Sequence, residues 1–471
     1  MSSTEIGSIS LDDFLNQYLY YLRDRVNSLE AEKSELELKS AVFNDLSSKL
    51  EDLEDIAERL AQTGASSVFR SKTVTSSDET ILTATASGSA AVGSHTIFVT
   101  QLARAHSVVS NRYNQDDTTI SDANSGTKTF SITVNGETYN ISVTINAGDS
   151  NETVLSRIAT EINDATDGEV VASCVLDTPT TCKLSITSGS TGTAGKMTFT
   201  DTDGLLATLG VTNSSQATDT VGGYVYADLG NNELDAKLTV DGINVISSSN
   251  VVENVIQGVT LTLLAEQEDG DSAVTITTSI DVEGIRSEIE DFLEAYNDAF
   301  EYLVSKTSVD GTTYERGILS GDYPYITLRT SLRQTMNTFI SSSSTYSALS
   351  QIGISSSRSG TFSISDSDAL EEAITEHPEA LEELFAGTDG IATTLVSLLD
   401  GYTSPGGTIS SSKKAVNSKI DLIEDSIDRQ EEYIRVRENA LREQFSALQE
   451  ALYALQMSQA IANSYSSLLG I

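Results

Sequence analysis

Apolar residues recur at every seventh position near both ends of the chain. A sustained repeat of this period predicts a helix whose apolar stripe packs against another helix. The first series is Leu15, Leu22, Leu29, Leu36, Phe43, Leu50 and Ala57, and the second is Ile420, Ile427, Ile434, Leu441, Leu448, Leu455 and Ala462. Because the two series lie at opposite ends of the sequence, we expect the chain to fold back on itself so that they meet.

The N-terminal series changes its apolar companions midway. They follow at plus four in the first part and at plus three in the second, and they are Leu19 and Val26, then Leu46, Leu53 and Leu60. The residues between these two parts, including Lys33, Lys39 and Ser40, are polar. We therefore predict two helical stretches with a weak joint near residues 34–40, and an end at Gly64.

From Phe69 onward the pattern changes to alternation of Thr, Ser, Val and Ile, which is typical of half-buried strands. The runs 129–134 and 139–145 flank Asn135-Gly136, a sequence that predicts a β-hairpin. A short amphipathic helix around Leu155, Ile158 and Ile162 follows it. Strands return from Leu234 to Ile276, with a turn at Asp241-Gly242, and we expect them to complete the sheet begun near Phe69.

Past Ile280 the apolar period becomes helical again. One helix face is expected to carry Ile285, Ile289, Phe292, Tyr296, Phe300 and Leu303. Further helices are predicted at residues 325–340, 366–385 and 391–399. The sequence Ser-Pro-Gly-Gly at 404–407 marks a break, and the C-terminal heptad helix should then run to about Ser467.

Together these elements predict an α+β multidomain chain whose parts are nested within one another. The expected parts are terminal coiled-coil or helical-bundle legs (1–40 and 430–471, partly disordered when free), a helical bundle domain (41–68 and 281–429), and two mainly antiparallel β head domains, one at 69–104 and 233–280 and an outer one inserted at 105–232.

The two heptad stripes are assigned to different contacts. Ordinary intrachain helix pairing is the more common role of such stripes, and we assign it to Phe43, Leu46, Leu50, Leu53, Ile420, Ile427, Ile434 and Leu441. The outermost parts have too little other apolar sequence nearby to cover them. We therefore expect them to be disordered in the isolated protein and to contact other subunits through Leu15, Leu19, Leu22, Val26, Leu29, Leu448, Leu452 and Leu455.

The net charge of the 471-residue chain is −41. So acidic a surface opposes binding to nucleic acid, which requires clustered Lys and Arg, and serves solubility instead. Residues 1–10 lack the basic start and apolar run of a secretory signal. No stretch of about 18 apolar residues predicts a membrane span, so we expect no membrane insertion.

The candidate chemical groups do not form a catalytic or metal-binding pattern. His95, His106 and His377 are not spaced with other ligands as a metal site requires. Residues 190–197 resemble a phosphate loop but have Ser190 where the first Gly belongs and Met197 where Ser or Thr is needed. The acidic turns at 201–204 and 268–271 lack the spacing of a calcium loop. We therefore predict no cofactor and no enzyme activity.

Cys174 and Cys182 flank Pro179 in a predicted hairpin. A disulfide between them is sterically plausible, and two buried free thiols are the alternative. The spacing does not decide between the two.

Several blocks of the chain resemble the flagellar filament cap family, also called flagellar hook-associated proteins. The most specific is Val-Thr-Gln-Leu-Ala-Arg-Ala-His at 99–106, followed by 235–263 with Thr-Val-Asp-Gly at 239–242. Further similar blocks lie at 6–12, 69–86, 352–354 and 360–385, and the strand-helix-strand stretch 130–186 is similar to a repeat of hook and flagellin-related proteins.

This resemblance implies a function in assembly. It implies a homo-oligomeric ring at the distal tip of the bacterial flagellum, outside the cell, reached by type III export without a cleaved signal peptide. The ring would promote insertion of flagellin and prevent its loss, and hook–filament junction proteins would be neighbours. A cytoplasmic export chaperone would bind the C-terminal segment, here Leu452, Leu455, Ile461, Leu468 and Leu469.

Two alternatives remain. Paired terminal helices also occur in other flagellar axial proteins, such as flagellin or a hook–filament junction protein, although the blocks at 101–106 and 239–263 favour the cap. The Ser/Thr-rich module at 105–232 could instead make the chain a surface adhesin that binds host or surface glycans.

Overall fold

The computed structural model describes residues 11–226, 233–311, 313–340 and 345–469, and the side chains of residues 17–464 within these ranges. Helices and antiparallel sheets are combined, as the sequence predicts. The chain divides into two compact units, one formed by residues 1–63 with 285–471 and the other by residues 64–284. The first unit therefore contains both ends of the sequence.

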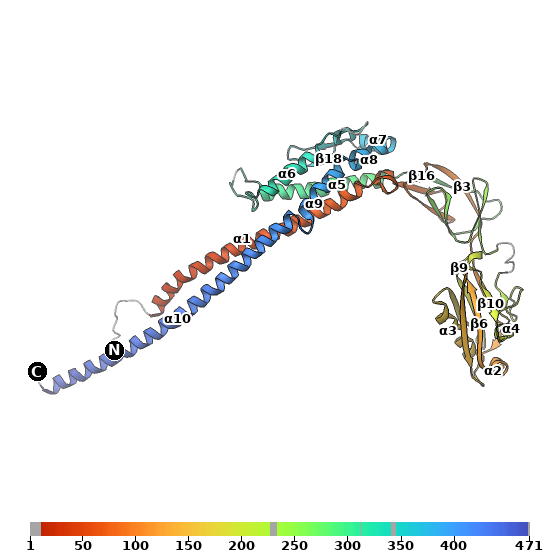
Figure 1. The fold of residues 1–471 in the computed structure, drawn as a ribbon, viewed down its shortest axis with the longest axis horizontal. Helices are drawn as coiled ribbons and strands as arrows, with labels where there is room; N and C mark the ends of the chain where they lie inside the picture. Colours follow the sequence, from red (N-terminus) through yellow and green to blue (C-terminus); the bar gives the residue numbers. More distant parts are fainter. Residues whose placement is uncertain (1–10, 227–232, 312, 341–344, 470–471) are drawn as a thin grey trace. The chain divides into compact units, whose positions relative to one another are not determined.

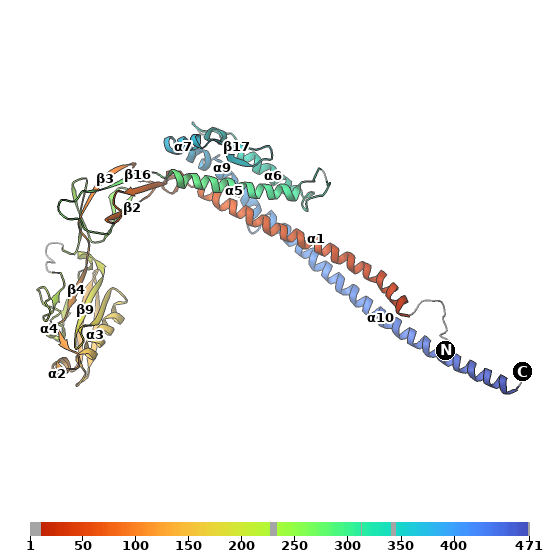
Figure 2. The same cartoon turned by 180° about the vertical axis from the view of Figure 1, so that it is seen from behind.

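The first unit is mainly helical (Figure 1). Its elements are α1 (Leu11–Leu60), α5 (Val282–Thr307), α6 (Tyr323–Met336), η4 (Leu349–Ile352), β17 (Ile354–Ser356), β18 (Phe362–Ile364), α7 (Ser367–Glu376), α8 (Pro378–Ala386), α9 (Ile391–Thr403) and α10 (Thr408–Leu469). Two opposite views show α1 and α10 side by side, with α9 between α10 and the shorter helices (Figures 1 and 2).

The predicted joint in the N-terminal helix is wrong, because α1 is continuous from Leu11 to Leu60. The polar residues in its middle bind α10 instead of interrupting the helix. The Lys33 ammonium lies 2.7 Å from the Glu424 carboxylate, and the Ser40 hydroxyl donates to the Asn417 side chain at 3.1 Å. These partners are remote in sequence, so the pattern of residues within α1 alone could not predict them.

The predicted helix at 366–385 is two helices. α7 ends at Glu376, and α8 begins at Pro378, whose missing N–H and fixed φ suit the first turn of a new helix. The helix predicted at 325–340 ends earlier, at Met336, where the Asn337 side-chain amide donates to the Arg333 carbonyl oxygen. The predicted apolar face of α5 is confirmed: Ile285, Ile289, Phe292, Tyr296, Phe300 and Leu303 are all buried.

The second unit contains two clusters of buried apolar residues. The first cluster lies among β1 (Lys72–Ser76), β2 (Leu82–Ala86), β3 (Gly93–Gln101), β12 (Ala236–Val240), β13 (Ile243–Ser247), β14 (Val251–Ile256), β15 (Val259–Leu263) and β16 (Val274–Ile280). These strands form antiparallel sheets in the orders β1-β16-β3-β12-β13 and β14-β15-β2. Strands from both sides of residues 105–232 thus share a sheet, as expected for an insertion.

The inserted residues surround the second cluster. They form β4 (Ala105–Val109), β5 (Tyr113–Asn114), α2 (Thr119–Asn124), β6 (Gly126–Val134), β7 (Glu137–Ile145), α3 (Asn151–Thr166), β8 (Val170–Thr178), β9 (Thr181–Thr191), η3 (Thr193–Gly195), β10 (Thr198–Asp201), α4 (Leu205–Leu209) and β11 (Gly223–Tyr224). The hairpin β6–β7 is confirmed, with Asn135 and Gly136 both at positive φ. Helix α3 covers this cluster through Leu155, Ile158 and Ile162.

The four-part division predicted from the sequence remains a prediction, since the units described here are two. Within the described part of the chain, no helix has the length and apolar character needed to span a membrane.

Candidate functional site: the paired terminal helices

The seam between α1 and α10 is built from the two heptad series. Leu19 and Val26 of α1 and Ile434 of α10 are buried against one another, and Leu22 and Ile427 pack on them half-buried. The expectation that Leu19, Leu22, Val26 and Leu29 have no cover within the chain is therefore wrong, because α10 supplies it. Their contact with other subunits remains a prediction. The side chain of Leu15 lies outside the described residues.

The intrachain part of the seam carries the most deeply buried leucines. Phe43, Leu46, Leu50 and Leu53 are at most 1% exposed, and α9 as well as α10 lies against α1. On α10, Ile434 is buried, whereas Ile420, Ile427 and Leu441 are half-buried. The predicted pairing residues thus lie in the helical unit, and α1 uses a second helix, α9, that the heptad pattern does not indicate.

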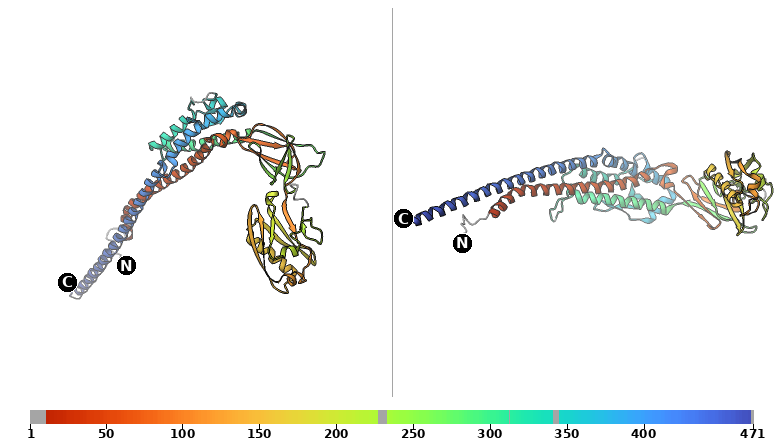
Figure 3. Two further views of the ribbon diagram at one scale, coloured as in Figure 1. Left: turned by 45° about the vertical axis from the view of Figure 1, so that its right-hand side comes forward. Right: turned by 90° about the horizontal axis from the view of Figure 1, so that it is seen from below.

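The end of α10 extends past the start of α1 (Figure 3). Between Lys33–Glu424 and Ser40–Asn417 the two helices run antiparallel, residue for residue. If this pairing is continued toward the start of α1, Leu11 falls opposite the region of Ser446 on α10. Beyond that level α10 continues to Leu469 with large apolar side chains in solvent: Leu448, Leu455 and Ile461 are 52%, 63% and 53% exposed. Leu452 is half-buried.

Leu448 and Leu455, seven residues apart, lie on one face of α10, whereas Met457 and Ile461 lie near its opposite face. All four are exposed within the described part of the chain, and we call this set of exposed apolar side chains around the end of α10 the tail stripe (Leu448, Leu455, Met457 and Ile461). Clustered exposed apolar residues mark an interaction surface. Of the residues assigned to the chaperone, Leu452, Leu455 and Ile461 belong to this stretch of α10, whereas the side chains of Leu468 and Leu469 lie outside the described residues. No structural observation tests the chaperone assignment, and it remains a prediction.

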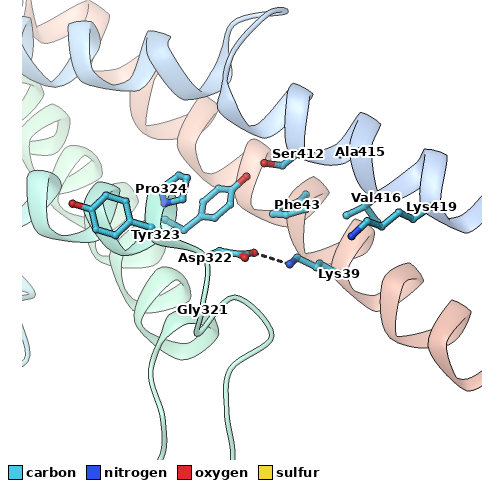
Figure 4. A pocket seen from close by; sticks show the side chains of 11 residues that line it. Lys39, Phe43, Gly321, Asp322, Tyr323, Pro324, Ser412, Ala415, Val416 and Lys419 are labelled. Carbon is cyan, nitrogen blue, oxygen red and sulfur yellow. Dashed lines mark ion pairs between the residues drawn. The ribbon is translucent and has the colours of Figure 1, made fainter.

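A pocket of about 300 Å³ lies beside the seam, where α1, the start of α6 and α10 meet (Figure 4). We call it the basic pocket. Its lining includes Lys39, Phe43, Asp322, Tyr325, Ser412 and Lys419. The Lys39 ammonium is 2.7 Å from the Asp322 carboxylate, and the rings of Phe43 and Tyr325 are 5.3 Å apart. Figure 4 shows Lys39 and Lys419 on neighbouring helices facing the same opening.

Tyr325 is the buried polar group of this pocket. It is 1% exposed, and its hydroxyl makes no hydrogen bond of good geometry, although Ser412 lies near it. Burial raises the pKa of Tyr325 to about 12, although the nearby Ser412 lowers it in part. The pocket was not predicted from the sequence. The available signal was the stretch 401–420, which has three lysines and no acidic residue in a chain of net charge −41.

The block 99–106, most specific in the sequence, crosses from β3 to β4. The backbone of such a crossover has no sheet partner, so its polar groups need others. The Gln101 amide donates to the carbonyl oxygens of Glu233 and Asp235, both at 2.8 Å. The Leu102 N–H and the Arg104 guanidinium both donate to Glu266, and these contacts lower the pKa of that carboxyl. These contacts bind the start of the crossover to residues 233–266 of the inner sheet part.

Each of the three histidines has its own structural contacts. His95 lies 2.7 Å from the Asp241 carboxylate. His106 is buried and accepts a hydrogen bond from the Met197 N–H at 2.8 Å, and His377 contacts the ring of Tyr346. In the described residues, no three His, Cys, Asp or Glu side chains are grouped so that they could hold a metal ion.

Polar groups of the loop at 190–197 and of the acidic turn at 201–204 form hydrogen bonds to other residues of this chain. In the loop at 190–197, the Thr193 N–H donates to Asp235 at 2.6 Å, and a side chain at Gly192 would overlap Ser248. Asp203 accepts from the N–H and the hydroxyl of Thr129, both at 2.7 Å. These groups are therefore occupied in local structure.

Cys174 and Cys182 are free thiols on the neighbouring strands β8 and β9. The register pairs Cys174 with Leu184 and Cys182 with Leu176, so the two cysteines are diagonal neighbours instead of directly opposite. Diagonal pairs are spaced more widely than a disulfide prefers. Of the two alternatives, the structure has free thiols, and burial raises the pKa of Cys182 to about 12.

Comparison with family models gives two matches that divide the chain. The model of the flagellar hook-associated protein 2 N-terminus matches residues 8–106, and that of its C-terminus matches residues 234–457. The chain belongs to the flagellar hook-associated protein 2 family, the filament cap proteins of the bacterial flagellum. The stretch between the two matches corresponds closely to the inserted outer module.

Relatives in this family cover different shares of the chain. The flagellar hook-associated protein 2 of Escherichia coli K12 is 28% identical over 434 residues, which are 89% of this chain and 88% of the relative. The polar flagellar hook-associated protein 2 of Vibrio parahaemolyticus is 30% identical over 187 residues, which are 39% of this chain and only 28% of that protein.

A solved relative agrees with the fold. The crystal structure of the flagellar cap protein FliD D1-D2-D3 domains from Escherichia coli has a TM-score of 0.64 and 26% identity, covering 80% of this chain and 99% of that chain. The hook-associated protein 2 family is a family of structural flagellar proteins, so the prediction of an assembly protein is confirmed at that level.

Proposed function

We propose that this chain caps the distal end of the flagellar filament, where several copies form a ring that guides exported flagellin into place and prevents its loss. The single observation that carries the mechanism is the tail stripe, which continues α10 beyond the reach of α1. An exposed apolar helix supported at its base by a packed bundle can bind and release successive partners.

The cap acts by binding and not by bond making. Its candidate groups are apolar side chains and lysines, and the buried histidine and both cysteines are engaged in packing. The proposed partners are flagellin, other copies of the chain, the hook–filament junction proteins and a cytoplasmic chaperone for the C-terminal segment. The proposed place is the flagellar tip outside the cell.

A deletion with add-back tests this function. Removal of the gene should release flagellin into the medium as unassembled monomer, and addition of the purified full chain should restore filament growth. Flagellin in the medium and filament length by electron microscopy are the two measurements. Normal filaments in the deletion strain, or leakage that the added protein leaves unchanged, would contradict the proposal.

A further inference from the structure

Charge is segregated within the helical unit. Residues 408–420 of α10 contain Lys413, Lys414 and Lys419 and no acidic residue. Two acidic stretches without lysine or arginine lie in the same unit: residues 51–58 of α1, and residues 366–383, which form α7 and the start of α8. The second is the longer. The exposed acidic side chains there are Asp366, Asp368, Glu371, Glu372, Glu376 and Glu379; we call these the acidic face.

The two regions lie at opposite ends of α5. The segment before α6 is bound to the end of α5, where the Leu319 N–H donates to the Lys306 carbonyl oxygen at 2.8 Å. The acidic face is held at the beginning of α5, where Arg286 reaches the Ser367 hydroxyl at 3.4 Å. Figures 1 and 2 show the start of α6 and α7 at the two ends of this helix. One copy therefore cannot bring its own two patches together.

The basic pocket has more donors than acceptors. Lys39 is paired with Asp322, whereas Lys419 makes no ion pair within the part of the chain that the structure describes. The Tyr325 hydroxyl is buried and makes no hydrogen bond of good geometry, although Ser412 lies close enough to interact with it, and a poorly satisfied buried polar group costs free energy. A carboxylate entering this pocket would meet the Lys419 ammonium.

We propose that the acidic face of one copy docks on the basic pocket of the next copy. This inference rests on the proposed ring. Contacts between two different patches generate head-to-tail assemblies, which close into rings. Copies with a net charge of −41 repel one another, so a local pairing of opposite charges both orients neighbours and offsets part of this repulsion.

Charge reversal tests the contact in the full chain. The basic reversal is Lys419→Glu, and the acidic reversal is Glu372→Lys. Each should weaken self-association about tenfold in sedimentation velocity, while the combined variant recovers it. The matched control, Lys128→Glu, makes the same change of charge as the basic reversal in the other unit. The association of the unaltered chain should also weaken with added salt.

Tyr325→Phe separates docking from folding. It removes a buried hydroxyl that a docking side chain cannot reach and keeps the packing, so neither the melting temperature nor self-association should fall; the loss expected of the basic reversal then comes from Lys419 and not from a disturbed pocket wall. The inference is overturned if the basic reversal associates like its control, or if the combined variant stays as weak as either single reversal. If either of these results is obtained and the variants still restore filament growth in the add-back assay, the docking inference is rejected and the proposed cap function is retained. Failure of the unaltered chain in the add-back rejects that function separately.

Discussion

His106 shows how one buried side chain makes the stability of the outer module depend on pH. Its imidazole accepts a hydrogen bond from the Met197 N–H, and so must remain neutral at that nitrogen. Burial, and secondarily the positive charge of Lys196, lower the pKa of His106 to about 4. An unfolded histidine titrates near its ordinary value of about 6.5.

The sign follows from proton binding. Below about pH 6.5 the unfolded chain takes up a proton that the folded chain excludes until about pH 4, so this histidine lowers the free energy of unfolding as the pH falls through that interval. The full effect is about 3 kcal/mol. His106→Asn keeps an acceptor for Met197 and cannot titrate. Denaturant unfolding at pH 7.5 and pH 4.5 should therefore show a smaller loss in this variant; equal losses would reject the argument.

At the level of elements, the pairing of α1 with α10 depends on a thin apolar seam. Val26 is 6% exposed and lies against Ile434. Val26→Asp places a carboxylate in this contact, and we expect it to cost about 2–3 kcal/mol locally and to separate the start of α1 from α10. Hydrogen exchange of the amides in residues 17–32 measures this.

The control for Val26 is Ser28→Asp, which introduces the same carboxylate at an exposed position of the same helix. Exchange should accelerate in the first variant and remain slow in the control. Equal protection in both would show that Val26 is not part of a stable seam.

The elements that were predicted correctly are those with local causes. Asn135-Gly136 and Asp241-Gly242 adopt positive φ and close two-residue hairpins, since the turn chemistry lies in the turn itself. The joint at residues 34–40 was wrong because the partners of Lys33 and Ser40 are on α10. Sheet order and the basic pocket were beyond prediction for the same reason, as each combines segments distant in the sequence.

At the level of the whole molecule, the tail stripe should be dispensable for folding and required for function. Removal of residues 448–471 takes away a segment whose described side chains, those of residues 448–464, are almost all exposed. We expect the melting temperature of the remaining chain to change little, whereas chaperone binding and filament capping should be lost. Calorimetry, pull-down and the add-back assay measure these three properties.

A substitution tests the same surface without shortening α10. Leu448→Ser, Leu455→Ser and Ile461→Ser remove the apolar stripe, and Gln449→Ser, Gln459→Ser and Asn463→Ser are matched changes at other exposed positions. Only the first set should abolish capping. A large fall in melting temperature in the truncated chain would mean that the stripe belongs to the core.

The placement of both chain ends in one unit has a consequence for the order of folding. Ser40 and its partner Asn417 are 377 residues apart, whereas residues 64–284 form a continuous unit. If the chain emerges from a narrow channel with its N-terminus first, all residues of the β-rich unit are outside before α10 is. The β-rich unit can then fold while α1 has not yet met its partner helix α10. Contacts of long sequence separation close last. Completion of the helical unit would then have to await α10, and only from that moment would the tail stripe have a firm base.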